Sequence, residues 1–130
     1  MAGCARLWAA DEAELGRRLF SGELPLSARI AGHTDTLPAS AIRCSNCHRT
    51  QAVGAASAPS FGPVLEARLL SGRIARRGGP PSAYSAAALC KLLREGIDPA
   101  WVMVAPAMPR YDASDAQCQA LWAHLSRPAP

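Results

Sequence analysis

The segment Cys44–His48, Cys-Ser-Asn-Cys-His, constrains this chain more than any other feature. Two thiols three positions apart on a helical turn can each add to one vinyl group of a haem, and the adjacent imidazole can then bind the iron. This spacing is typical of covalent c-type haem attachment. We therefore predict one covalently attached haem c, with Cys44 and Cys47 as its anchors and His48 as the proximal iron ligand.

Two other kinds of site also use closely spaced cysteines. A thioredoxin-like redox pair follows a strand in a βαβ setting, and no strand pattern precedes Cys44. A zinc site needs a second close pair of ligands, whereas Cys90 and Cys118 are single cysteines in helical patterns. Both alternatives are therefore weaker than haem attachment.

The haem iron has a sixth position, which electron carriers with one haem usually close with a second strong ligand such as methionine. Met108 lies between Pro106 and Pro109, which stiffen the backbone on both sides. A rigid loop can hold a weak thioether ligand, so we predict Met108 as the distal ligand. The alternatives are Met103, whose surroundings suggest ordinary packing, His33, or an open iron site.

Helical periodicity and capping residues predict an all-α chain with long loops. The segment Cys44–His48 is expected to open a helix or a turn, and neither a convincing strand pattern nor an internal repeat is present. His124, in the last helix, is expected to be exposed. The predicted helices span residues 11–20, 64–70, 86–94 with Ser85 as the cap, and 114 to about 126.

Composition limits the class of the protein and its partners. A length of 130 residues fits one domain. Much of the hydrophobic content is alanine and only 5% of the residues are aromatic, so a large apolar cofactor would supply missing core. The net charge of +4 comes almost entirely from scattered arginines, which a GC-rich coding sequence also produces. This charge favours acidic partners over nucleic acid, and no apolar run is long enough to span a membrane.

The chain resembles the class I cytochrome c family, bacterial periplasmic type, in three segments. These are residues 16–20, the motif Cys44–His48, and residues 89–125, which include Met108-Pro-Arg-Tyr. The resemblance implies a cytochrome c fold of four to five short helices with long loops around one haem. It implies the same anchors and ligands, and terminal helices that cross where Gly16 approaches Leu121 or Trp122.

Residues 11–127 are expected to form the cytochrome c domain, with an N-terminal extension at 1–10 and a C-terminal tail at 128–130.

The expected function is the transfer of single electrons between a periplasmic dehydrogenase and a downstream acceptor, without catalytic residues. One alternative is a fixed electron-transfer subunit of a larger oxidoreductase, docked through residues 21–43, a connection longer than the family's. The other is a haem sensor or enzyme with an open distal site.

The haem motif and the other three cysteines bear on where the protein is located and on how its thiols are bonded. Haem attachment to this motif takes place outside the bacterial cytoplasm, so we expect a periplasmic location, although the first twenty residues lack a signal-peptide pattern. Ala-Gly-Cys4 matches the end of a lipoprotein cleavage site, by chance or because Cys4 carries a lipid anchor. Cys90 and Cys118 are either separate buried thiols or joined in a disulfide.

Overall fold

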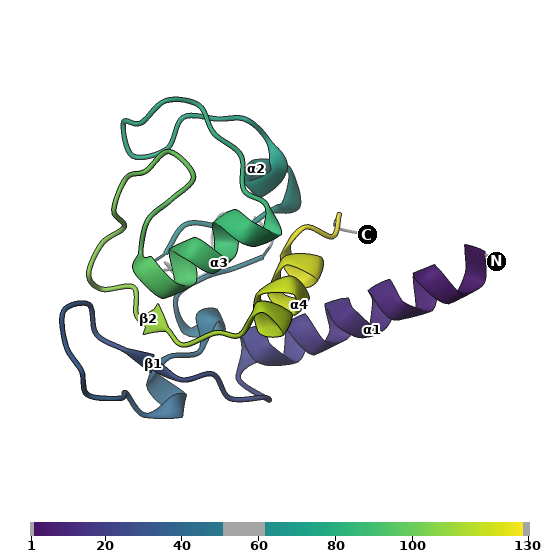
Figure 1. Cartoon of the computed structure of the whole chain (residues 1–130), viewed down its shortest axis with the longest axis horizontal. Coiled ribbons are helices and arrows are strands. Elements are labelled where there is room, and N and C mark those ends of the chain that lie inside the picture. Colours follow the sequence, from purple (N-terminus) through teal and green to yellow (C-terminus); the bar gives the residue numbers. More distant parts are fainter. Residues whose placement is uncertain (1, 51–61, 129–130) are drawn as a thin grey trace, which may run out of the picture.

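The computed structural model describes residues 2–50 and 62–128, and only the backbone of residues 2–7 and 9. The described chain is mainly helical with long loops, as predicted, and includes one short pair of antiparallel strands (Figure 1). Strands of two residues are too short to show an alternating pattern, so the sequence did not reveal them. The elements are α1 (Ala2–Ser21), β1 (Ala28–Arg29), α2 (Ala67–Ser71), α3 (Ala86–Glu95), β2 (Arg110–Tyr111) and α4 (Asp115–Leu125), with 3₁₀ turns at Ala39–Ala41 and Cys44–Asn46.

Helix α1 is much longer than the predicted helix at residues 11–20. It begins at Ala2 and runs without a break across the expected boundary between the extension and the domain. The acidic residues from Asp11 onward resemble a helix start, but the alanine-rich stretch before them also favours helix. The first turns of α1 extend beyond α4 (Figure 1), and Trp8 on this part is 77% exposed.

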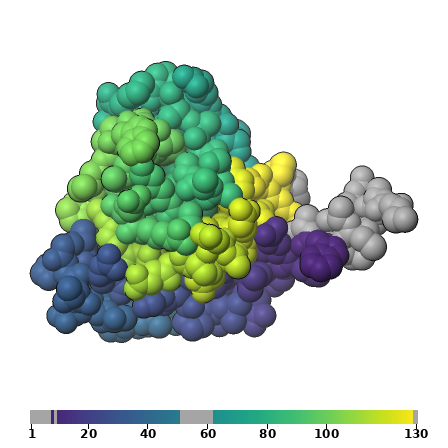
Figure 2. Space-filling view, in the orientation of Figure 1, coloured from purple at the N-terminus to yellow at the C-terminus, as the bar shows by residue number. Residues whose placement is uncertain are grey.

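Helices α1 and α4 cross at Gly16. A Cβ atom at Gly16 would lie 1.9 Å from the carbonyl oxygen of Ala120, so the two backbones are in direct contact. Figure 2 shows α4 lying against α1 on the surface. The predicted crossing of the terminal helices is therefore confirmed, with Ala120 in place of Leu121 or Trp122 as the residue closest to Gly16.

The prediction that His124 is exposed was wrong. Its ring is half-buried beside Phe20, with 5.5 Å between the two ring centroids. Burial is the main reason that the pKa of His124 lies below its usual value, and the nearby charge of Arg17 adds to the effect. The crossing of α1 and α4 therefore covers a titratable group.

Side-chain caps define the starts of α3 and α4, close to the predicted positions. The Ser85 hydroxyl accepts a hydrogen bond from the amide of Ala88 at the start of α3. Ser114 and Gln117 form a reciprocal capping box at the start of α4. Because each cap satisfies amides that lack an intrahelical partner, these helix starts were readable from the sequence. Helix α2 is shorter than predicted and begins at Ala67.

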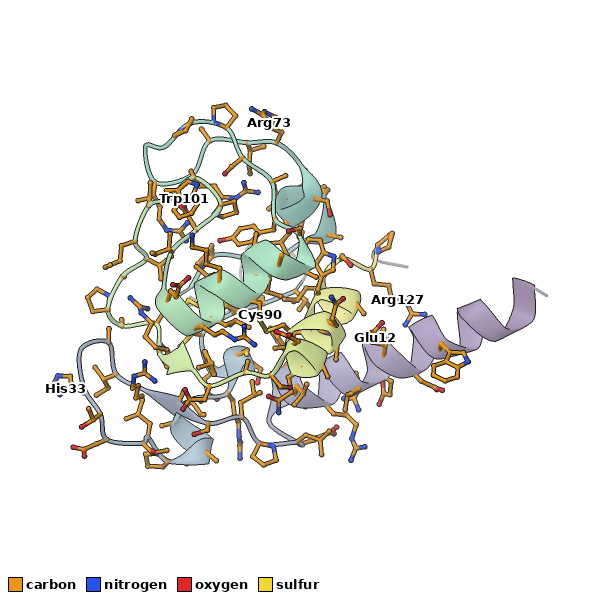
Figure 3. The ribbon with its side chains drawn as sticks, in the orientation of Figure 1. Glu12, His33, Arg73, Cys90, Trp101 and Arg127 are labelled. Atoms are coloured by element: carbon orange, nitrogen blue, oxygen red, sulfur yellow. A yellow bond between two sulfur atoms is a disulfide. The ribbon has the colours of Figure 1, made fainter. Side chains whose placement is uncertain are left out.

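A disulfide joins α3 to α4. The Cα atoms of Cys90 and Cys118 are 5.3 Å apart, and both residues are buried. This finding selects the joined alternative over two separate thiols. The label of Cys90 in Figure 3 marks the place where the two helices meet.

No helix in residues 2–50 and 62–128 combines the length and the apolar character needed to cross a membrane. The predicted absence of a membrane-spanning helix holds for this part of the chain.

Candidate cofactor site

A cavity of about 620 Å³ lies between the Cys44–His48 segment, helix α3 and the loop that contains Met108. Its size is in the range of small-molecule and cofactor sites. Leucines from α2, α3 and α4 form much of its wall, and no acidic residue lines it among the described residues. The structure thus brings all four predicted site residues to one mainly apolar cavity: Cys44, Cys47, His48 and Met108.

The orientation of His48 leaves one ring nitrogen available to a ligand. Its Nδ1 atom is 2.8 Å from the carbonyl oxygen of Pro63. Because a carbonyl can only accept, we assign the proton to Nδ1, which leaves the lone pair on Nε2. A hydrogen bond of this kind typically fixes the tautomer and orientation of a metal-binding histidine. Gly62 makes the arrangement possible, since a Cβ atom there would lie 2.4 Å from His48 Cε1.

Cys44 and Cys47 are held by one tight turn of the backbone. The carbonyl oxygen of Cys44 accepts hydrogen bonds from the amides of Cys47 at 3.2 Å and His48 at 2.9 Å. Both thiols are free and half-buried at the cavity. Burial raises the pKa of Cys44 to about 11, against the opposing effect of the nearby hydroxyl of Tyr111. Burial therefore favours the neutral thiol of Cys44. The predicted helix or turn at this segment is confirmed as a turn.

Among the predicted candidates for a second iron ligand, only Met108 lines the cavity. Its side chain is half-buried against the core. Met103 is 67% exposed, so the expectation that it packs in the ordinary way was wrong. His33 is exposed on the loop after β1, at the edge of the molecule (Figure 3).

The cationic side chains of the cavity were not predicted from the sequence. Arg43, Arg76 and Arg77 all line it. The guanidinium of Arg76 lies over the ring of Tyr84, 5.0 Å from the ring centroid, and donates to the carbonyls of Leu69 and Ser82. These arginines are scattered in a chain rich in arginine, so nothing in the sequence distinguished them. A cavity with apolar walls and cationic groups fits an apolar ligand that carries negative charge.

The carboxylate of Asp98 is completely buried and forms an ion pair with Arg77, with 3.0 Å between Nη1 of Arg77 and Oδ2 of Asp98. It also accepts hydrogen bonds from the amides of Ala100 and Val102, each at 2.9 Å. Asp98 thereby fixes both the next loop and one arginine of the cavity wall.

Histidine, cysteine, aspartate and glutamate side chains do not gather in groups of three or more that could hold a metal ion by themselves, within residues 2–50 and 62–128. Cys90 and Cys118 are joined to each other and are not free to complete a zinc site. The side chain of Cys4, the predicted lipid anchor, lies outside the part that the structure describes. Compared with protein-family models, curated proteins and solved structures, this chain matches none of them.

Proposed function

We propose that this protein is a c-type cytochrome that carries one covalent haem and transfers single electrons. The observation that carries the proposal is the meeting of the Cys44–His48 segment and Met108 at one cavity. The cytochrome c fold expected from the sequence resemblance is part of the same proposal.

The residues at the cavity fit a haem. The thiols of Cys44 and Cys47 would each add across a vinyl group to form a thioether, and His48 has its Nε2 lone pair available for iron. Met108 would supply the second ligand of the iron, and its thioether would favour a high reduction potential. When bound, the haem supplies an iron that gains or loses one electron. The leucines of the wall would exclude water from it.

The proposed partners are redox proteins with acidic docking patches, because the chain has a net charge of +4. The proposed location is the bacterial periplasm, where this kind of haem attachment takes place, with a lipid anchor at Cys4 as a further proposal. Electron transfer requires no catalytic residue in this chain, so we propose no enzymatic role.

The test is haem staining after denaturing electrophoresis of protein produced with a c-type haem attachment system. The wild type should stain, Cys47→Ser should keep a single thioether, and the Cys44→Ser/Cys47→Ser double variant should lose the stain. A Cys90→Ser/Cys118→Ser variant is the matched control and should stain like the wild type, because these cysteines are joined to each other. An unstained wild type, or full staining of the first double variant, would overturn the proposal.

Co-purification distinguishes a free carrier from a fixed subunit. A free carrier should elute alone at the size of one chain. Stable elution with a larger oxidoreductase would replace the free-carrier form of the proposal with the subunit form.

A further inference from the structure

Arg110 is a buried arginine that binds the Met108 loop. Arg110 is only 6% exposed. Its guanidinium donates from Nη1 to the carbonyl of Met108 at 2.7 Å and from Nη2 to the carbonyl of Val104 at 3.2 Å. The ion pairs of the described residues do not include Arg110. A buried cation is retained at a cost in desolvation, which hydrogen bonds must offset. Here the acceptors are the two ends of one short loop.

Among the described residues, few other hydrogen bonds hold the loop from Val104 to Met108. The Val104 amide binds the carbonyl of Gly96 at 2.8 Å, and the Met108 amide binds the carbonyl of Ala105 at 3.1 Å. The residues between the two ends, 105–107, are exposed. Packing therefore does little to hold the middle of the loop in place.

Gly96 provides the space that Arg110 occupies. A Cβ atom at Gly96 would lie 2.3 Å from Cζ of Arg110, so the guanidinium lies directly against this glycine. Gly96 also ends α3 in the left-handed conformation, with a φ of 73°. One glycine thus ends a helix of the cavity wall and admits the arginine that binds the loop.

We propose that Arg110 is a positioning residue that holds Met108 at the cavity by binding both ends of its loop through one guanidinium. The inference rests on the proposed function, in which Met108 binds iron. A thioether is a weak ligand, so its occupancy of the iron depends on how firmly the loop is held. The planar fork of arginine can bind two carbonyls at once in a fixed geometry, which the single ammonium of lysine does not reproduce.

The first test compares Arg110→Lys with Arg94→Lys in the haem-loaded protein. Arg94 is a matched control, because it binds the carbonyl of Ala113 at 2.8 Å and Asp115 at 2.8 Å, away from the Met108 loop. We expect Arg110→Lys to bind cyanide at least tenfold faster in the ferric state and to lose the far-red sulfur–iron band on heating before the helices unfold. Arg94→Lys should bind cyanide within twofold of the wild-type rate. Unchanged cyanide binding in Arg110→Lys, with loss of the band only on unfolding, would overturn the proposal.

The second test moves Arg110 without replacing it. Gly96→Ala should displace the guanidinium and again speed cyanide binding. Gly32→Ala is the control, because Gly32 has a similar φ of 79° with nothing within 4 Å of the added Cβ. Equal rates of cyanide binding in the two variants would contradict the positioning role of Arg110. A faster rate in Gly96→Ala alone would support this role.

Amide hydrogen exchange separates this inference from the proposed function. The Met108 amide should exchange at least tenfold faster in Arg110→Lys than in the wild type, while amides in the middle of α3 stay unchanged. This measurement reads the hydrogen bonding of the loop directly and uses the protein as purified. A wild type without covalent haem would refute the proposed function, and unchanged exchange at Met108 would refute the role of Arg110.

Discussion

The hydroxyl of Tyr111 donates a hydrogen bond of 2.7 Å to the carbonyl oxygen of Ile42, a residue 69 positions away in the chain. Ile42 lies just before the Cys44–His48 segment, and Tyr111 lies just after the Met108 loop. Both residues are buried and line the cavity. Burial, with Cys44 nearby, raises the pKa of Tyr111, so its hydroxyl stays protonated as a donor. One bond thus connects the two segments that carry the proposed iron ligands.

Tyr111→Phe should destabilise the protein by about 1–3 kcal/mol, because it leaves the buried carbonyl of Ile42 without its donor. Chemical denaturation measures this change in the free energy of unfolding. A variant as stable as the wild type would show that the carbonyl finds another donor.

Met108→Ala should open the sixth iron position of the haem-loaded protein. We expect the reduction potential to fall by a sizeable part of the roughly 0.8 V that axial ligands can span, and carbon monoxide to bind rapidly to the ferrous form. Each fall of about 59 mV for one electron is a tenfold change in equilibrium. Met103→Ala is the control, since Met103 is 67% exposed and does not line the cavity. Rapid carbon monoxide binding by the wild type would favour a sensor or enzyme over a carrier.

Gly16→Ala should destabilise the crossing of α1 and α4. The added methyl group would overlap the carbonyl of Ala120 at 1.9 Å, and overpacking of this kind costs about 1–3 kcal/mol. This cost should exceed the roughly 1 kcal/mol by which alanine favours a helix over glycine. Glu12→Ala, an exposed change on the same helix, should stay within about 0.5 kcal/mol of the wild type. A stabilised Gly16→Ala variant would mean that the helices are farther apart.

Removing the disulfide should lower the free energy of unfolding by about 2–5 kcal/mol. The bond joins residues 28 positions apart and connects two helices of the cavity wall. Intact mass should rise by two hydrogen atoms when the protein is reduced. No change in mass on reduction would show that the two thiols are separate.

Stability should fall as the pH decreases below about 6.5, in part because of His124. Its pKa in the folded protein is lowered, mainly by burial and also by Arg17 and Arg127, against the opposite effect of Glu14. The unfolded chain therefore binds this proton at a higher pH than the folded chain does, so the stability present above pH 6.5 is lost as the pH falls through the folded pKa. His124→Gln should reduce the decrease in melting temperature between pH 7.5 and 5.5. An equal decrease in both proteins would assign it to other groups.

The sequence alone predicted the features that depend on neighbouring residues. The turn at Cys44–His48 and the caps at Ser85 and Ser114 involve atoms only a few positions apart, so their residue types indicate the local geometry. The start of α1 was predicted wrongly for a related reason, because the alanine-rich stretch and the acidic residues after it indicate different helix starts.

Only the tertiary structure decided which distant residues meet. It joined Cys90 to Cys118, brought Met108 rather than Met103 or His33 to the cavity, and placed Arg110 across the Met108 loop. These outcomes depend on how α1, α3 and α4 pack and on the course of the long loops between them. Many courses are compatible with the same helical pattern, because that pattern shows which face of a helix is buried and not which residue it faces.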